Sequence, residues 1–169
     1  TVTISVLDVD EITPSLSSAS PADNATSIGI SSNIVLTFSE AVDVESGNIV
    51  IKKSSDNSTV ESIDVTSNQV TGSGTTQITI NPSSNLSSST QYYVQIPATA
   101  FDDSSSNSYA GITDTTSLSF TTADVSSPSL SSASPEDNAT AVAVDSNIVL
   151  TFSEVVDVES GNILIKKSS

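Results

Sequence analysis

Five residue types are missing from the 169-residue sequence: cysteine, histidine, methionine, tryptophan and arginine. Without histidine or cysteine, the chain has no Ser-His-Asp or Cys-His nucleophile pair. The usual ligand sets of zinc, haem and iron–sulfur clusters are missing for the same reason. The lack of cysteine is typical of a protein in a reducing compartment, and equally of a secreted bacterial protein that avoids thiols.

Positive charge is also scarce. The four basic residues are lysines at positions 52, 53, 166 and 167, against 20 acidic residues, and the net charge is −16. Such a chain repels phosphate backbones, so we expect no nucleic-acid partner. No apolar run approaches the ~20 residues of a membrane helix, so we expect no membrane insertion. Because no basic-then-apolar signal segment opens the chain, we interpret Thr1 as an internal position of a longer protein.

Hydroxyl side chains dominate what is present, since serine and threonine account for 58 of the 169 residues. An acidic chain that is rich in serine can be disordered. Here, however, 36% of the residues are hydrophobic, and they follow a regular pattern. We therefore predict a folded, acidic protein.

The chain contains an internal repeat. Residues 14–55 recur at residues 128–169, at an offset of 114, with 34 of 42 positions identical. We interpret residues 14–127 as a complete domain, residues 128–169 as the first strands of a second, truncated repeat, and residues 1–13 as the last strand and linker of a preceding domain. The sequence thus predicts a tandem array with a 114-residue period. Near-identity of neighbouring repeats favours a structural role, because two copies of a dedicated active site would tend to diverge.

Short stretches of alternating apolar and polar residues predict β-strands in the complete domain. In residues 33–38, the side chains of Ile34, Leu36 and Phe38 share one face. Further strands are predicted at residues 48–52, 59–65, 76–80, 91–96 and 117–121, with the inward positions Ile49, Ile51, Val60, Ile63, Val65, Ile78, Ile80, Tyr92, Val94, Ile96, Leu118 and Phe120. About seven strands in ~100 residues indicate an all-β, immunoglobulin-like β-sandwich.

The connections between these strands have turn composition. Residues 72–74, Gly-Ser-Gly, predict a hairpin turn, and residues 81–85 predict a longer loop. No stretch has a sustained helical period, and at most one helical turn is expected at residues 98–103.

Several segments together resemble a known family. They are SPADNAT (20–26), SNIVLTFSEAVDVESGNIVIKK (32–53), YYVQI (92–96), AFDDSSSNSYAG (100–111) and LSFTT (118–122). They resemble the bacterial Ig-like domains of S-layer proteins and large RTX-type adhesins, over residues 14–124 and again over residues 128–169. Residues 1–11 are similar to the closing strand and linker of cadherin-like repeats. Where many relatives read Ile-Asp-Ala-Thr-Ala-Phe, this chain has Pro97, which removes a carboxylate that could join a cation site.

The acidic residues of the first predicted junction are candidate calcium ligands. Asp8, Asp10 and Glu11 stand just before the complete domain begins. Oxygen ligands from loops are what Ca²⁺ takes, six to eight at a time. We predict a calcium ion here, which would cancel the repulsion between carboxylates and stiffen the hinge. The alternative is solvated surface charge that keeps the protein soluble.

A second candidate calcium loop contains Asp102, Asp103 and Asn107. It could reach the same end of the sandwich and contribute ligands to the junction. The alternative for this loop is an ordinary turn that is rich in aspartate and asparagine. Glu40, Asp43 and Glu45 form a third acidic group, which recurs at positions 154, 157 and 159. We expect it in a loop between two strands, with carboxylates that accept backbone N–H bonds rather than a cation.

Aromatic residues are too few for a strong carbohydrate prediction. Tyr92 is expected in the core, which leaves Tyr93 and Tyr109 as the side chains that could stack on a sugar. Paired carboxylates can hydrolyse glycosides, but the chain has no arginine, histidine or tryptophan to position such a substrate. No enzyme activity is therefore predicted. Sequons at Asn24, Asn57, Asn85 and Asn138 leave glycosylation open.

Three functional hypotheses follow. The leading one is a non-enzymatic, repeated module of a large secreted or cell-surface bacterial protein, an adhesin, surface layer or fibre, in which repetition sets length and stiffness. The second is a filament subunit whose open half-sandwich is completed by a strand of a neighbouring chain. The third is a carbohydrate-binding accessory module. The expected partners are neighbouring repeats or identical chains, with glycans as a further candidate and Ca²⁺ as the candidate ion.

Overall fold

The computed structural model describes residues 11–167, which divide into a first unit that ends at Val125 and a second that starts at Ser126. The regular secondary structure of these residues consists of β-strands only. The first unit contains β1 (Leu16–Ser20), β2 (Ala25–Ile28), β3 (Ile34–Val44), β4 (Asn48–Lys53), β5 (Thr59–Asp64), β6 (Val70–Thr71), β7 (Thr75–Ile80), β8 (Gln91–Gln95), β9 (Phe101–Asp102) and β10 (Ser119–Thr122). The second contains β11 (Leu130–Ser134) and β12 (Val149–Phe152).

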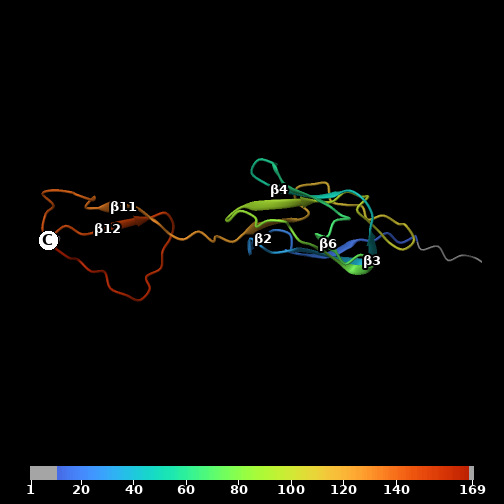
Figure 1. Cartoon of the computed structure of the whole chain (residues 1–169), viewed down its shortest axis with the longest axis horizontal. Coiled ribbons are helices and arrows are strands. Elements are labelled where there is room, and N and C mark those ends of the chain that lie inside the picture. Colours follow the sequence, from blue (N-terminus) through green and yellow to red (C-terminus); the bar gives the residue numbers. More distant parts are fainter. Residues whose placement is uncertain (1–10, 168–169) are drawn as a thin grey trace, which may run out of the picture. The chain divides into compact units, whose positions relative to one another are not determined.

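The first unit is a sandwich of two sheets (Figure 1). One sheet has the strand order β1-β3-β7-β6, with β9 paired to β3, and the other has the order β2-β10-β8-β4-β5. All pairs are antiparallel except β2 and β10, which are parallel. These orders correspond to the ABED and GFCC′ sheets of an immunoglobulin-like domain, in which the first strand is shared between the sheets. The predicted fold class is therefore confirmed.

The core lies between the two sheets and contains all of the predicted inward side chains except Val60. Ile34, Leu36 and Phe38 alternate inward along β3, and each is almost fully buried. The largest side chains with no meaningful exposure are Tyr92, Phe101, Phe120, Ile34, Leu36, Ile49, Ile51, Ile63, Ile78, Ile80, Ile96 and Leu118. Phe38 makes edge contacts with Phe101 and Tyr109, at ring-centroid distances of 5.4 and 5.2 Å. The alternation in the sequence thus identifies most of the core.

The loop expected for Glu40, Asp43 and Glu45 is wrong for Glu40 and Asp43, because β3 continues to Val44, and of these three only Glu45 lies between β3 and β4. The register of β3 against β7 shifts between Thr37 and Val42, after which Val42 is again buried. Val44 then pairs with Phe101 of β9. The apolar alternation resumes after the shift, and the end of β3 pairs with a new partner strand, β9, so the chain stays extended.

Two other predictions need correction. Val60 is 40% exposed, because the inward positions of β5 are those of Ile63 and, just beyond the strand, Val65. A shift of one residue moves a side chain to the opposite face of a sheet. Residues 98–100 form a turn that leads into β9 rather than a helical turn, since Phe101 pairs with β3 and is buried.

The second unit contains one hairpin. β11 pairs with β12 through Leu130↔Phe152, Ser132↔Thr151, Ala133↔Leu150 and Ser134↔Val149. This register is that of β1 against β3 moved by 114 positions, including its irregularity. Residues 14–55 are called the first head, residues 128–167 the second head, and residues 56–124 the tail half. Within the described residues the large apolar side chains of the second head are exposed.

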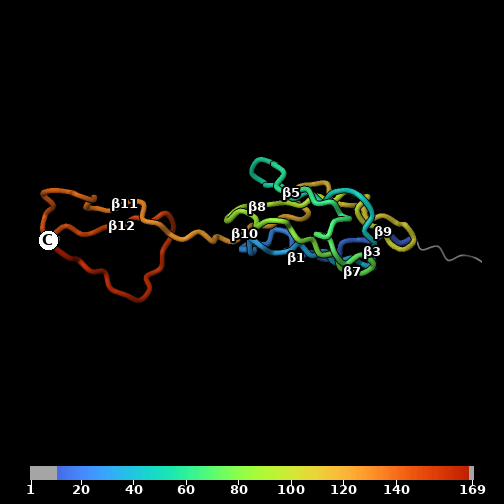
Figure 2. Tube along the Cα trace, in the orientation of Figure 1, coloured from blue at the N-terminus to red at the C-terminus, as the bar shows by residue number. Residues whose placement is uncertain are grey.

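The chain runs through the first unit from one end to the other (Figure 2). At the start, the Ser15 N–H donates to the Ser39 hydroxyl at 3.0 Å, beside the second half of β3. At the other end, β10 stops at Thr122 beside Ile28, and the Ala123 N–H donates to the Ile28 carbonyl at 2.7 Å. Entry and exit at opposite ends are what an end-to-end array requires.

Candidate functional site

Asp103 organises the acidic loop that follows β9. Its side chain is 5% exposed. Its Oδ1 accepts the backbone N–H groups of Ser105 and Asn107, both at 2.8 Å, and its Oδ2 accepts the Asn107 side-chain N–H at 2.7 Å. The Asn107 side chain, together with the two backbone N–H groups, lowers the pKa of Asp103 despite its burial. These bonds form the aspartate-rich turn that was the alternative prediction for this loop.

The other candidate calcium ligands do not join Asp103 in one cluster. Asp102 lies on β9 as the cross-strand partner of Asp43 on β3. Glu11 is exposed, whereas Asp8 and Asp10 lie outside the described residues. Among residues 11–167, no three carboxylate, histidine or cysteine side chains come together to hold a metal ion. Calcium at the junction stays a prediction.

Asp43 is bonded to the turn between β6 and β7. The Ser73 hydroxyl donates to Asp43 Oδ1 at 3.4 Å. The same hydroxyl accepts the Val44 backbone N–H at 3.0 Å. Ser73 thus links the end of β3 to the predicted Gly72–Gly74 hairpin turn. This carboxylate has a structural partner in the described unit.

Three further aspartates accept hydrogen bonds from residues of their own turns, and the sequence analysis did not predict these turns. Asp114 accepts the backbone N–H groups of Thr116 and Ser117, both at 2.7 Å. The Ser117 hydroxyl donates as well, and these bonds lower the pKa of Asp114 far below its ordinary value. Asp56 and Asp64 make the same kind of turn with a hydroxyl residue two positions later. An aspartate followed two residues later by serine or threonine is the signal that could have found them.

All three tyrosines are buried, so the aromatic platform needed for sugar stacking is missing from the described residues. Tyr92 is in the core as predicted, and its hydroxyl accepts the Ser87 N–H at 2.9 Å. Tyr93 is only 3% exposed, and its hydroxyl donates to Asn57 Oδ1 at 3.0 Å. Tyr109 packs on Phe38, and burial raises the pKa of its hydroxyl. The carbohydrate alternative loses the side chains on which it depended.

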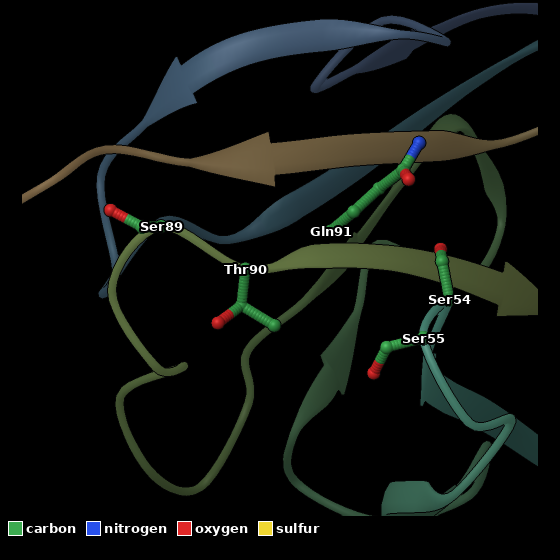
Figure 3. Close-up of a pocket in the computed structure, with 5 residues that line it drawn as sticks. All are labelled: Ser54, Ser55, Ser89, Thr90 and Gln91. Atoms are coloured by element: carbon green, nitrogen blue, oxygen red, sulfur yellow. The ribbon is translucent and has the colours of Figure 1, made fainter.

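A shallow hollow lies beside the start of β8 (Figure 3). Its volume is about 310 Å³, and its lining residues are Ser54, Ser55, Ser89, Thr90 and Gln91. Ser54 and Ser55 follow β4, Ser89 and Thr90 precede β8, and Gln91 is the first residue of β8. The lining has hydroxyl and amide groups but neither a charged nor an aromatic side chain. Such a surface offers neutral hydrogen bonds, and no base lines the hollow that could activate one of its hydroxyl groups as a nucleophile.

The exit from the first unit is held by hydrogen bonds outside the sheets. The Ser88 hydroxyl accepts the Val125 N–H at 2.9 Å, and it lies within hydrogen-bond distance of the Ala123 carbonyl and the Asp124 carboxylate. The Ser89 N–H also donates to the Ala123 carbonyl at 3.1 Å. Residues 123–125 are therefore bonded to the loop before β8. No sequence pattern indicates this contact, because Ser88 and Ser89 stand in a run of similar serines.

The chain belongs to the bacterial Ig-like domain family, which it matches over residues 10–122 and again over residues 124–168. CopC from Methylosinus trichosporium OB3b is a similar solved structure, with 17% identity and a TM-score of 0.46 over 68% of this chain and 97% of that one. The S-layer protein rSbsC(31-844) is another, with 18% identity and a TM-score of 0.43 over 70% of this chain.

The match covers only 15% of the S-layer protein's length. Comparison with the curated proteins finds no match. In residues 11–167 there is no helix of the length and apolarity that a membrane crossing needs. The family assignment rests on the domain match, which covers nearly the whole chain.

Proposed function

We propose that this chain is a non-enzymatic structural module of a large secreted or cell-surface bacterial protein. Repeats of the module would set the reach and stiffness of that protein. The observation that carries the proposal is the path of the chain, which enters the first unit beside Ser39 and leaves it beside Ile28 at the opposite end. Modules with this path add length with each repeat.

The bonded exit supports stiffness. Residues 123–125 are held by Ser88 and Ser89, so the chain leaves the sandwich hydrogen-bonded to the loop before β8. A short linker keeps neighbouring units from folding back on each other, whereas a long serine-rich linker would behave as a flexible coil. The −16 charge adds repulsion between units at low salt.

The described side chains support a structural rather than a chemical role. The carboxylates with the most strongly lowered pKa values, such as Asp114, accept hydrogen bonds within their own turns. The hollow beside β8 holds neutral groups only. The family match supports the same role, since it covers the whole of the sandwich.

Small-angle X-ray scattering on tandem arrays tests the proposal. Arrays of one, two and four copies of residues 14–127, joined directly, should show a maximum dimension that rises in proportion to the number of copies. A matched array with ten Gly-Ser residues inserted after Val125 should be more compact for the same number of folded units. Direct arrays that are as compact as the Gly-Ser arrays would overturn the proposed spacer role.

A further inference from the structure

The outer face of the β1-β3-β7-β6 sheet carries only uncharged side chains where the four strands lie side by side. These side chains alternate along each strand with those that pack in the core, and none of them is buried. They form two cross-strand rows, which we call the neutral face: Ser20, Val35, Thr79 and Thr71 in the first row, and Ser18, Thr37 and Gln77 in the second. The face is therefore rich in hydroxyl groups and free of charge.

The outer face of the other sheet carries charges of both signs. Lys52 of β4 is the cross-strand partner of Tyr93, and Asp64 of β5 is the partner of the exposed Asn48. On the first sheet, the acids of β3 come only at and after its register shift, beyond the two rows. In a chain with a net charge of −16, an uncharged face across four strands is an exception.

The part of the neutral face that belongs to the first head recurs in the second head. The eight positions at which the two heads differ include none of its residues, whereas one of them, Val50 against Leu164, lies on β4 of the other sheet. The counterparts have the same register as well, and they are Ser132, Ser134, Val149 and Thr151. A surface that returns with the repeat offers the same contact in each module.

A neutral hydroxyl face fits a second copy of itself. When two copies meet through the same face, each residue near the symmetry axis lies close to its own counterpart. Charged side chains in such a contact would oppose like charges, which is strongly unfavourable. A hydroxyl or amide group both donates and accepts hydrogen bonds, so it can pair with its own kind. Val35 and the threonine methyl groups add apolar contact, because the side chains of two facing sheets interdigitate.

We propose that the neutral face is a lateral contact surface, on which the same face of a second copy of the module packs. The inference rests on the tandem arrangement of the proposed function, because a single contact is small. Four strands and two rows cover roughly 300 Å², whereas a stable interface needs about 800 Å² from each partner. Single modules therefore stay monomeric, and arrays that carry one face per repeat associate through several contacts at once.

Salt should strengthen this association. The net charge of −16 makes two copies repel each other at low ionic strength. The screening length falls from about 30 Å at 0.01 M salt to about 3 Å at 1 M, so salt removes the repulsion. The neutral face contains no charged group whose ion pair salt could weaken. A contact between lysines and carboxylates would show the opposite dependence.

Sedimentation velocity on direct arrays of residues 14–127 tests the proposal, since the whole core cluster of the first unit lies within these residues. In about 0.5 M salt, four-copy arrays should dimerise with a dissociation constant at least about a hundredfold below that of single modules. Gln77→Lys in every copy should make the four-copy array monomeric. Gln91→Lys is the matched control, because Gln91 is also exposed but lies on β8 of the other sheet. Both substitutions change the net charge equally, so only the place of the lysine differs.

The proposal is overturned if four-copy arrays stay monomeric in high salt, if Gln77→Lys arrays associate as the parent array does, or if Gln91→Lys prevents association equally. Retention of monomeric arrays on cellulose, lost in Gln77→Lys, would also overturn it and assign the face to a neutral glycan. The spacer role is tested separately. Arrays that are extended in scattering but never associate would support that role and contradict the lateral contact.

Discussion

Residues 14–55 and 128–169 of this chain are identical at 34 of 42 positions, but the first head and the second head do not form the same structure. In the first head, β3 is 11 residues long and β4 follows it, whereas in the second head β12 has four residues and residues 153–167 form no strand. Only the hairpin that β11 and β12 form is common to both heads. The difference therefore separates what the local sequence determines from what its partners determine.

The shared hairpin is a local structure. Its two strands are brought together by a connection within the same head, and its register is fixed by the same side chains in both copies. The strands that differ are those with partners in the tail half. β2 pairs with β10, β4 pairs with β5 and β8, and the end of β3 pairs with β9. An extended segment without such a partner leaves its backbone groups to water and forms no sheet.

The largest expected effect comes from Ile49→Ala and its matched control Ile163→Ala. Ile49 is fully buried, so its truncation should lower the free energy of unfolding of the first unit by about 2–5 kcal/mol. Ile163 is exposed, so the same change there should alter that free energy by less than about 0.5 kcal/mol. Urea unfolding of both variants measures the difference. Equal effects would mean that the two heads are packed alike.

A second pair of variants compares two glycines with left-handed φ angles. Gly47 has φ of 113°, and an added Cβ would lie 2.8 Å from Pro97 Cγ, whereas nothing lies within 4 Å of the same position at Gly161. Gly47→Ala should destabilise the first unit by about 1–3 kcal/mol through backbone strain and this contact. Gly161→Ala should leave the melting temperature of the first unit unchanged, as calorimetry can show. A larger shift for Gly161→Ala would contradict the comparison.

Asp103→Ala tests the role of the acidic turn. The pKa of Asp103 in the folded state is below its ordinary value of 3.8, so its contribution to stability is complete at pH above 3.8 and is lost as the pH falls through the folded-state value. At pH 7 the variant should melt at a lower temperature than the parent chain, and the two should converge below pH 3.8.

The control variant is Asp157→Ala. Asp157 is exposed in the second head, and its substitution removes the same charge as Asp103→Ala. It should leave the melting of the first unit unchanged at pH 7. The decrease in melting temperature caused by Asp103→Ala should be the same in millimolar calcium and in chelator, because the carboxylate oxygens of Asp103 accept three N–H bonds. A decrease in melting temperature that appears only in calcium would show that Asp103 is an ion ligand instead.

The smallest expected effect is that of Ser88→Ala at the exit. Loss of one hydroxyl acceptor should cost about 0.5–1.5 kcal/mol at most, and it should increase proteolytic cleavage after Val125. Ser84→Ala, on the exposed loop before β8, is the matched control. If cleavage rates are unchanged in Ser88→Ala, the stiffness attributed to the exit is contradicted.

The core could be predicted from the sequence because strict alternation marks a half-buried strand. Residues such as Leu36, Ile78 and Phe120 were identified in this way and are buried. β1 and β2 could not be predicted from the sequence, because Leu-Ser-Ser-Ala-Ser and Ala-Thr-Ser-Ile show little apolar alternation. Both strands lie at sheet edges, where the neighbouring strands hold them. The burial of Tyr93 on the other face also depends on a distant residue, Asn57, which lies in the turn after β4.

The candidate site was less predictable than the fold. Loop composition placed Asp103 and Asn107 together, but whether they bind an ion or each other depends on the loop's backbone geometry. The partners of Ser88 were also out of reach, because a hydroxyl gives no pattern by which the sequence could indicate its acceptor or donor. Hydrogen bonds across 35 or more positions are products of the completed fold.

Hydrogen exchange within a single molecule tests the central claim most directly. Residues 41–53 and 155–167 differ only at positions 41 and 50, which are alanine and valine in the first head and valine and leucine in the second. Their intrinsic exchange rates are thus nearly equal, and their peptides differ in mass. At micromolar concentration, residues 48–53 should exchange orders of magnitude more slowly than residues 162–167, which should exchange almost as fast as an unfolded peptide. Equal protection of the two segments would contradict the claim that partners in the tail half determine the structure of each head.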